Sequence, residues 1–112
     1  ADVHTMEMIR EKGLLRTIQE VLPAFQKRAD AIFISVDMDV LDQAHAPGCP
    51  AIGPGGLYTE ELLQAVRFLA QEADISGIEI VEVDPTLDFR DMTSRAAAHV
   101  ILHALKGFKL SR

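Results

Sequence analysis

Residues 31–42 read AIFISVDMDVLD, an apolar run that gives way abruptly to carboxylates, and this stretch decides the fold. Its first half is short, β-branched and apolar on both faces, which is typical of a buried strand in a parallel sheet. A second stretch of this kind, IEIVEV, covers residues 78–83 and ends at Asp84 and Pro85. Two such strands separated by a helical segment predict an α/β fold with helices packed on a parallel sheet.

Helical patterns surround the two strands. Thr5 is placed to cap a first short helix that Gly13 ends, and a second apolar pattern of helical spacing extends to Phe25. Pro23 interrupts this pattern, so we expect a kink there or a further helix that begins near it. Thr59 is the predicted cap of the next helix. A last helix begins near Thr93 or Ser94 and turns four apolar residues inward: Val100, Ile101, Ala104 and Leu105.

The composition is that of one small domain. The chain has 112 residues, of which 48% are hydrophobic and 25% charged, and this argues against disorder. Its formal net charge of −6 argues against nucleic acid or an anionic membrane as a partner. The single cysteine, Cys49, excludes a disulfide framework. No signal peptide or membrane-spanning run is evident, so we expect a soluble, cytoplasmic protein.

Two parallel strands cannot form a sheet that is covered on both faces. We therefore expect residues 1–112 to be part of a larger α/β unit. We also expect the isolated chain to fold poorly or to self-associate, because apolar surface and strand edges would be uncovered.

Carboxylates cluster where the first strand ends. Asp37 and Asp39 are two residues apart, so on an extended backbone they project to the same side, and Asp42 follows as the loop begins. Hard oxygen ligands of this kind suit Mg²⁺ or Mn²⁺. The alternative is that these residues cap the loop through Asx-type hydrogen bonds.

The second strand adds two glutamates. Glu79 and Glu82 are three residues apart, so in a regular strand they face opposite sides. Glu82 lies nearer the carboxyl end of the strand, where ligands bind in open α/β sheets, and we assign it to the site. A glutamate on a buried strand needs a positive partner. Glu79 is interpreted as a structural acid.

Other candidates are weaker. His99 and His103 have the spacing of a helical metal pair, but they share a stripe with Arg95 and Lys106, which favours a solvated polar face. His45 lies in the loop after the acids without an evident partner. The cysteine of that loop is interpreted as packing rather than as a nucleophile.

The motifs resemble those of a known family. SVDMDVLDQAHAPGCPAIGPGGL, residues 35–57, resembles the third metal-binding signature of the ureohydrolases, which comprise arginases, agmatinases and formimidoylglutamases. ISGIEIVEVDPTLD, residues 75–88, resembles the next block of that family, in which a strand delivers a glutamate. The resemblance covers essentially the whole chain. DPTLDFRDMTSRAA, residues 84–97, is most similar to the formimidoylglutamase form.

The resemblance implies that residues 1–112 are the C-terminal part of a single ureohydrolase domain with a three-layer α/β/α, arginase-like fold. It implies that Asp37 bridges two Mn²⁺ ions, that Asp39 ligates one of them and that Asp42 shapes the loop. Glu82 would accept hydrogen bonds from a cationic amidine. The implied reaction is attack of a metal-bridging hydroxide on N-formimino-L-glutamate, which yields L-glutamate and formamide in histidine degradation. The full-length enzyme is expected to be a homo-oligomer.

Two of the family's motifs are absent from these residues. The other metal ligands belong to a Gly-Gly-Asp-His block and an Asp-Ala-His-x-Asp block, and the proton-shuttling histidine is missing as well. We therefore assign no catalytic residue in this chain and expect it to be inactive alone. Alternatives are another ureohydrolase, such as an agmatinase, an arginase or a guanidino-acid hydrolase, and a non-catalytic fragment or interaction module. A haloacid-dehalogenase-type phosphotransferase, which also has Asp-x-Asp after a strand, fits less well.

The implied substrate carries two carboxylates, which require a cation. Arg90 lies just past the acids and is the better candidate, since Arg95 belongs to the histidine stripe. The alternative is a loop clamp in which Arg90 pairs with Asp88 or Asp91.

Overall fold

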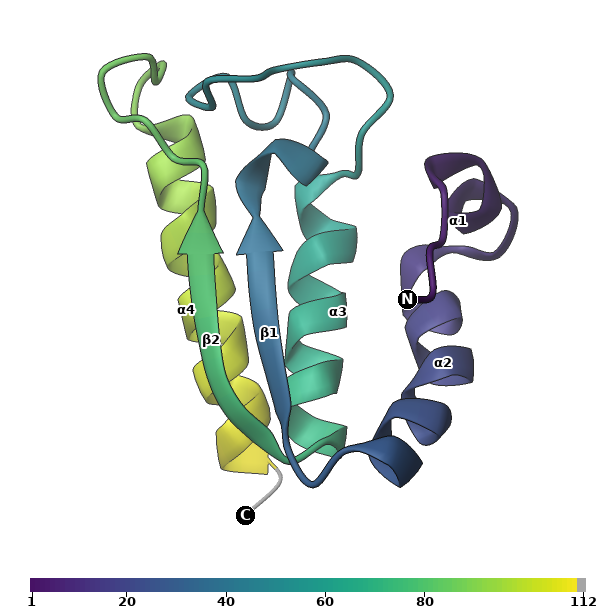
Figure 1. Ribbon diagram of the computed structural model, residues 1–112. Coiled ribbons are helices and arrows are strands. Elements are labelled where there is room, and N and C mark those ends of the chain that lie inside the picture. The colour runs from purple at the N-terminus through teal and green to yellow at the C-terminus, as the bar shows by residue number, and fades with distance from the viewer. Residues whose placement is uncertain (111–112) are drawn as a thin grey trace.

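The computed structural model describes residues 1–110, and in them the predicted α/β class is confirmed (Figure 1). Two parallel strands pair along their length, with Val36 opposite Ile80 and Asp37 opposite Val81. Residues 1–110 contain four α-helices, one of which lies between the two strands in the chain. The elements are α1 (Met6–Lys12), α2 (Leu14–Arg28), β1 (Ile32–Asp37), the 3-10 helix η1 (Met38–Val40), α3 (Thr59–Glu72), β2 (Ile75–Val81) and α4 (Met92–Leu110).

The second strand differs from its predicted bounds. It begins at Ile75, where pairing with β1 starts, and ends at Val81. The predicted end was wrong because Glu82 has a φ of 64°, a left-handed conformation that cannot continue a ladder. The argument that placed Glu79 and Glu82 on opposite faces of one strand therefore does not apply.

The first two helices are separated at Gly13, as predicted. Gly13 has a φ of 88° and donates its N–H to the carbonyl of Ile9 at 2.6 Å. No new helix begins at Pro23, because α2 is continuous through it. Pro23 and Gln19 are both exposed, so water can hydrate the Gln19 carbonyl that proline leaves without a donor.

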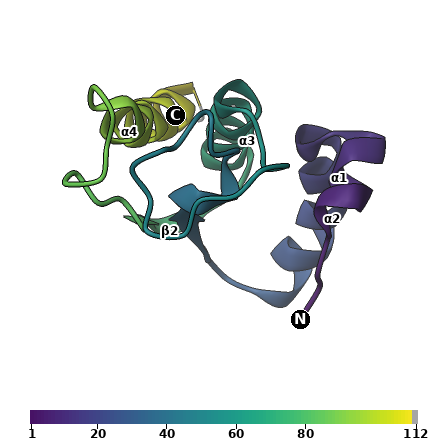
Figure 2. The ribbon, with the colours of Figure 1, turned by 90° about the horizontal axis from the view of Figure 1, so that it is seen from above.

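One face of the sheet is covered and the other is open. Helices α3 and α4 lie side by side on the covered face, while α2 stands beyond the edge of β1 and packs on α3 (Figure 2). A Cβ on Gly107 would lie 2.5 Å from the Arg67 carbonyl oxygen, so α3 and α4 are in close contact there. On the open face Phe33 is 58% exposed. Residues 1–110 thus form two layers of the predicted three, with helices on only one face of the sheet.

The inward face of α4 is narrower than predicted. Val100 and Ala104 are buried, whereas Ile101 and Leu105 are 49% and 57% exposed. Their predicted burial was wrong because each is one residue, about 100°, around the helix from the buried row.

Within residues 1–110, none of the helices combines the length and the apolar character that a membrane span requires.

Candidate functional site

The carboxyl ends of the two strands meet at one edge of the sheet. Asp37 is the last residue of β1 and pairs with Val81, so Glu82 follows immediately beside it. Because the strands are parallel, side chains that follow them gather at this edge, which is where ligands bind in open α/β sheets. The structure therefore brings the predicted metal and amidine residues to one place.

Asp39 also lies at this edge, but its backbone conformation differs from the predicted one. It lies in the 3-10 helix η1 and not on extended backbone, and its N–H donates to Asp37 Oδ1 at 3.1 Å. A side-chain hydrogen bond with Asp37, partial burial and the charges of Asp37 and Glu82 raise the pKa of Asp39. Asp37 and Glu82 are thus close enough to Asp39 to disfavour its ionisation.

A cation would relieve this repulsion, and carboxylate oxygens fit Mn²⁺. Within residues 1–110, however, no group of three or more histidine, cysteine, aspartate or glutamate side chains is arranged to hold a metal ion. Asp37 and Asp39 alone could supply only part of the ligand set of a metal ion.

Cys49 lies buried in the loop near these acids, with 3% of its surface exposed. Burial raises the pKa of its thiol, and the negative charges of Asp39, Asp37, Asp88 and Glu82 raise it further. A thiol that stays protonated is a poor nucleophile, which supports its interpretation as a packing residue.

Asp42 holds the two ends of the following loop together. Its Oδ1 accepts the N–H of Ala44 and its Oδ2 accepts the N–H of Gly55, both at 2.9 Å, and these bonds lower its pKa. A Cβ on Gly56 would lie 2.4 Å from the Asp42 nitrogen, so only glycine fits there. Arg10 of α1 donates to the Gly56 carbonyl at 2.8 Å.

Asp88 caps α4, a role that the sequence analysis missed. Its carboxylate accepts the N–H of Thr93 at 3.0 Å, and both the N–H and the hydroxyl of Ser94 at 2.9 Å. A Cβ on Gly48 would lie 2.6 Å from Asp88 Cγ, so the loop passes directly over this cap. The available signal was an aspartate shortly before the Thr-Ser pair that opens the helix. No ion pair of Arg90 is present in residues 1–110, so the loop clamp forms neither with Asp88 nor with Asp91.

Replacing Asp88 should weaken the full-length protein in a pH-dependent way. Burial would raise the pKa of Asp88, but hydrogen bonds from Ser94 and Thr93 hold it at about 2. This value lies below that of an unfolded aspartate, so the stabilisation is present above about pH 4 and is lost as the pH falls towards 2. We expect Asp88→Ala to lower the free energy of unfolding by about 1–2 kcal/mol at pH 7. Urea denaturation at pH 7 and pH 2.5 would contradict this if the difference from wild type were the same at both.

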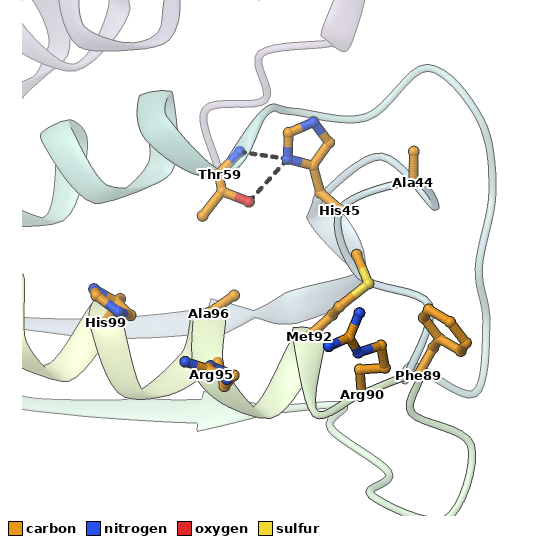
Figure 3. A pocket seen from close by; sticks show the side chains of 9 residues that line it. All are labelled: Ala44, His45, Thr59, Phe89, Arg90, Met92, Arg95, Ala96 and His99. Atoms are coloured by element: carbon orange, nitrogen blue, oxygen red, sulfur yellow. Dashed lines mark hydrogen bonds between the residues drawn. The ribbon is translucent and has the colours of Figure 1, made fainter.

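Arg90 lies in the loop between β2 and α4. It lines a hollow of ≈ 650 Å³ together with Arg95, His99 and His45, and none of the predicted metal or amidine residues lines this hollow (Figure 3). His45 accepts the N–H of Thr59 through Nδ1 at 3.2 Å, and the same atom lies 2.9 Å from the Thr59 hydroxyl. His45 is thus bound to the start of α3.

The two helical histidines differ in environment. His99 is exposed, as predicted, whereas His103 is partly buried and its Nδ1 has no hydrogen-bond partner within residues 1–110. Burial and the nearby charge of Arg67 lower the pKa of His103. The prediction of a solvated face therefore holds for only one of the pair.

Comparison with known proteins identifies similar chains. The sequence model of the arginase family matches residues 1–106. Formimidoylglutamase from Bacillus subtilis is 76% identical over 110 residues, which are 98% of this chain and 34% of that relative. The crystal structure of that formimidoylglutamase superposes with a TM-score of 0.97 over 99% of this chain and 35% of the other. Arginase from Bacillus caldovelox superposes with a TM-score of 0.87 at 33% identity, over 95% of this chain and 35% of the other. The chain thus spans about a third of the length of the curated relatives it matches.

Proposed function

Since the chain belongs to the arginase family, we propose that the full-length protein is a cytoplasmic formimidoylglutamase that hydrolyses N-formimino-L-glutamate to L-glutamate and formamide. The observation that carries this proposal is the 76% identity to a formimidoylglutamase, against 33% to the arginase. The carboxyl groups gathered at the strand ends support the same chemistry, because a cationic amidine and a metal ion both need acids.

We assign roles to three acids of this edge. Asp37 and Asp39 would hold manganese, two ions in the full-length protein, and bound manganese supplies a nucleophile by lowering the pKa of water. Glu82 accepts hydrogen bonds from the N–H groups of the amidine and so orients the formimino carbon. Its left-handed backbone, with a φ of 64°, is a strained conformation of the kind found at functional sites. Asp42 keeps the loop over the strand ends in one shape.

The direct test compares substrates with the full-length protein and Mn²⁺. We expect kcat/KM for N-formimino-L-glutamate to exceed that for agmatine or L-arginine by about 10³-fold or more, because a site built for charged groups rejects analogues that lack them. Preference for agmatine or L-arginine would indicate another ureohydrolase. Phosphatase activity would indicate the phosphotransferase, and metal binding without any turnover a non-catalytic protein.

For the carboxylates of the substrate, our proposed partner is Arg90. Arg90→Ala in the full-length enzyme should then raise KM for N-formimino-L-glutamate more than it lowers kcat, as expected for loss of uniform binding. Arg16→Ala, which removes an exposed arginine of α2, is the control. An unchanged KM in Arg90→Ala would place the substrate carboxylates elsewhere.

We also propose that the full-length protein is a homo-oligomer. The outer side of α4 carries Ile101, Leu102 and Leu105, which are about half exposed at 49%, 57% and 57%. A contact between subunits would cover apolar surface of this kind.

A further inference from the structure

Arg10 connects the first helix to the loop that follows the acids of β1. Its Nη2 atom donates to the carbonyl oxygens of Gly55 and Gly56, at 3.2 Å and 2.8 Å. These glycines are 45 and 46 positions further along the chain, so only the tertiary fold brings them to Arg10 (Figure 2). Hydrogen bonds from a charged donor are about twice as strong as neutral ones, so this contact ties the loop to α1.

The guanidinium group of Arg10 also contacts the start of α3. It lies 5.9 Å from the centre of the ring of Tyr58, the residue that precedes this helix. Tyr58 in turn stacks with His45, with 5.1 Å between the ring centres and 17° between the planes. A guanidinium group can donate hydrogen bonds from its edge and lie over an aromatic ring with its face. Arg10 therefore holds both the end of the loop and the beginning of α3.

The segment that Arg10 holds lies directly against the 3-10 helix η1, which carries Asp39. Leu57 donates its N–H to the carbonyl oxygen of Val40, the residue after Asp39, at 2.9 Å. A Cβ on Gly56 would lie 2.7 Å from the same oxygen, so no space separates the two segments. Because close-packed segments transmit displacements, a movement of residues 55–57 would change the position of η1.

The glycine segment and Asp39 also border one hollow. Gly55, Gly56, Asp39 and Met6 of α1 are among the residues that line a space of ≈ 290 Å³. Arg10 is not one of the lining residues, so it shapes this space through the segment whose carbonyls it holds. Consecutive glycines restrict the backbone little, and a contact from outside the loop therefore has a large effect on where this segment lies.

We propose that Arg10 is a positioning residue for the hydrolysis: it fixes residues 55–56 and, through them, the 3-10 helix that carries Asp39. This inference rests on the proposed function, in which Asp39 holds manganese. Arg10 acts on the geometry of Asp39 and not on the affinity for the substrate, because its own contacts are two carbonyl oxygens and an aromatic ring.

The test compares Arg10→Ala with the wild type in the full-length protein at saturating manganese. We expect kcat for N-formimino-L-glutamate to fall about tenfold and KM to change by less than about twofold, because a small misplacement of a reacting group slows the reaction without weakening substrate binding. Arg28→Ala is the matched control. Arg28 is an exposed arginine that also lies over a ring, 5.1 Å from the centre of Phe25, but at the end of α2 that leads into β1. It should change kcat by less than about twofold.

Hydrogen exchange of the backbone amides, followed by mass spectrometry, provides a measurement that needs no substrate. Peptides that contain residues 53–57 should exchange about tenfold faster in Arg10→Ala than in the wild type, whereas peptides from α4 should exchange at the same rate. If the wild type did not hydrolyse N-formimino-L-glutamate, the proposed function would fail, and the exchange rates would still decide whether Arg10 fixes this segment.

Arg10→Lys keeps the positive charge and a donor for the Gly56 carbonyl, so its kcat should lie between those of the wild type and Arg10→Ala. The thermal midpoint of each variant checks that the fold is retained. A lower midpoint with unchanged kcat in Arg10→Ala would show a purely structural contact and would overturn the proposal. Unchanged exchange of residues 53–57 would also overturn it, as would an equal loss of kcat in Arg28→Ala.

Discussion

Asp37→Ala and Asp39→Ala variants of the full-length protein are expected to lose hydrolysis of N-formimino-L-glutamate below detection while they keep their fold. The reason is that Asp37 and Glu82 raise the pKa of Asp39, so its carboxylate form is disfavoured without a cation. Removing either aspartate therefore costs metal binding far more than stability. Bound manganese and the thermal midpoint should be measured on the same samples.

The two variants differ in one structural respect. Asp37 also accepts the N–H of Asp39 at 3.1 Å, so Asp37→Ala should lose about 1 kcal/mol of stability that Asp37→Asn retains. Glu72→Gln is the control, since Glu72 is an exposed acid at the end of α3. Unchanged manganese content in both alanine variants would contradict the assignment of these residues as ligands.

Glu82→Gln should lower kcat/KM for N-formimino-L-glutamate by about 10²–10³-fold while bound manganese stays unchanged. A neutral amide cannot offset the positive charge of the amidine, and a loss of this size corresponds to about 2.7–4 kcal/mol of transition-state binding. This split between metal content and activity separates Glu82 from Asp37 and Asp39. Loss of manganese in Glu82→Gln would make Glu82 a ligand instead.

A second substitution tests why Glu82 has its backbone conformation. At a φ of 64°, glycine avoids a strain of about 1–2 kcal/mol, but it loses about 0.5–1 kcal/mol through its more flexible unfolded chain. Glu82→Gly should therefore be at least as stable as the wild type and yet as inactive as Glu82→Gln. Clear destabilisation of the glycine variant would show that the glutamate side chain supports the fold.

The chain order of strands, helices and acids was predictable because each signal is local. A β-branched, apolar run such as residues 32–36 favours an extended strand whichever partners surround it, although only Val36 of that run is buried. The glycine-ended first helix needs only its own turn chemistry. The Asp-x-Asp motif and the Pro/Gly-rich loop after it are recognisable from the spacing of their residues alone. These features were sufficient to predict the α/β class, the family resemblance and the end of the sheet at which the acids gather.

Tertiary contacts decided the rest. The loop at Gly48 packs against the Asp88 cap, and His45 binds Thr59, which is 14 residues further along the chain. Arg90 and Arg95 line one hollow, and Arg90 and Asp91 have left-handed backbones in the turn before α4. Each of these outcomes depends on segments that become neighbours only when the helices pack on the sheet, and local periodicity contains no information about such distances.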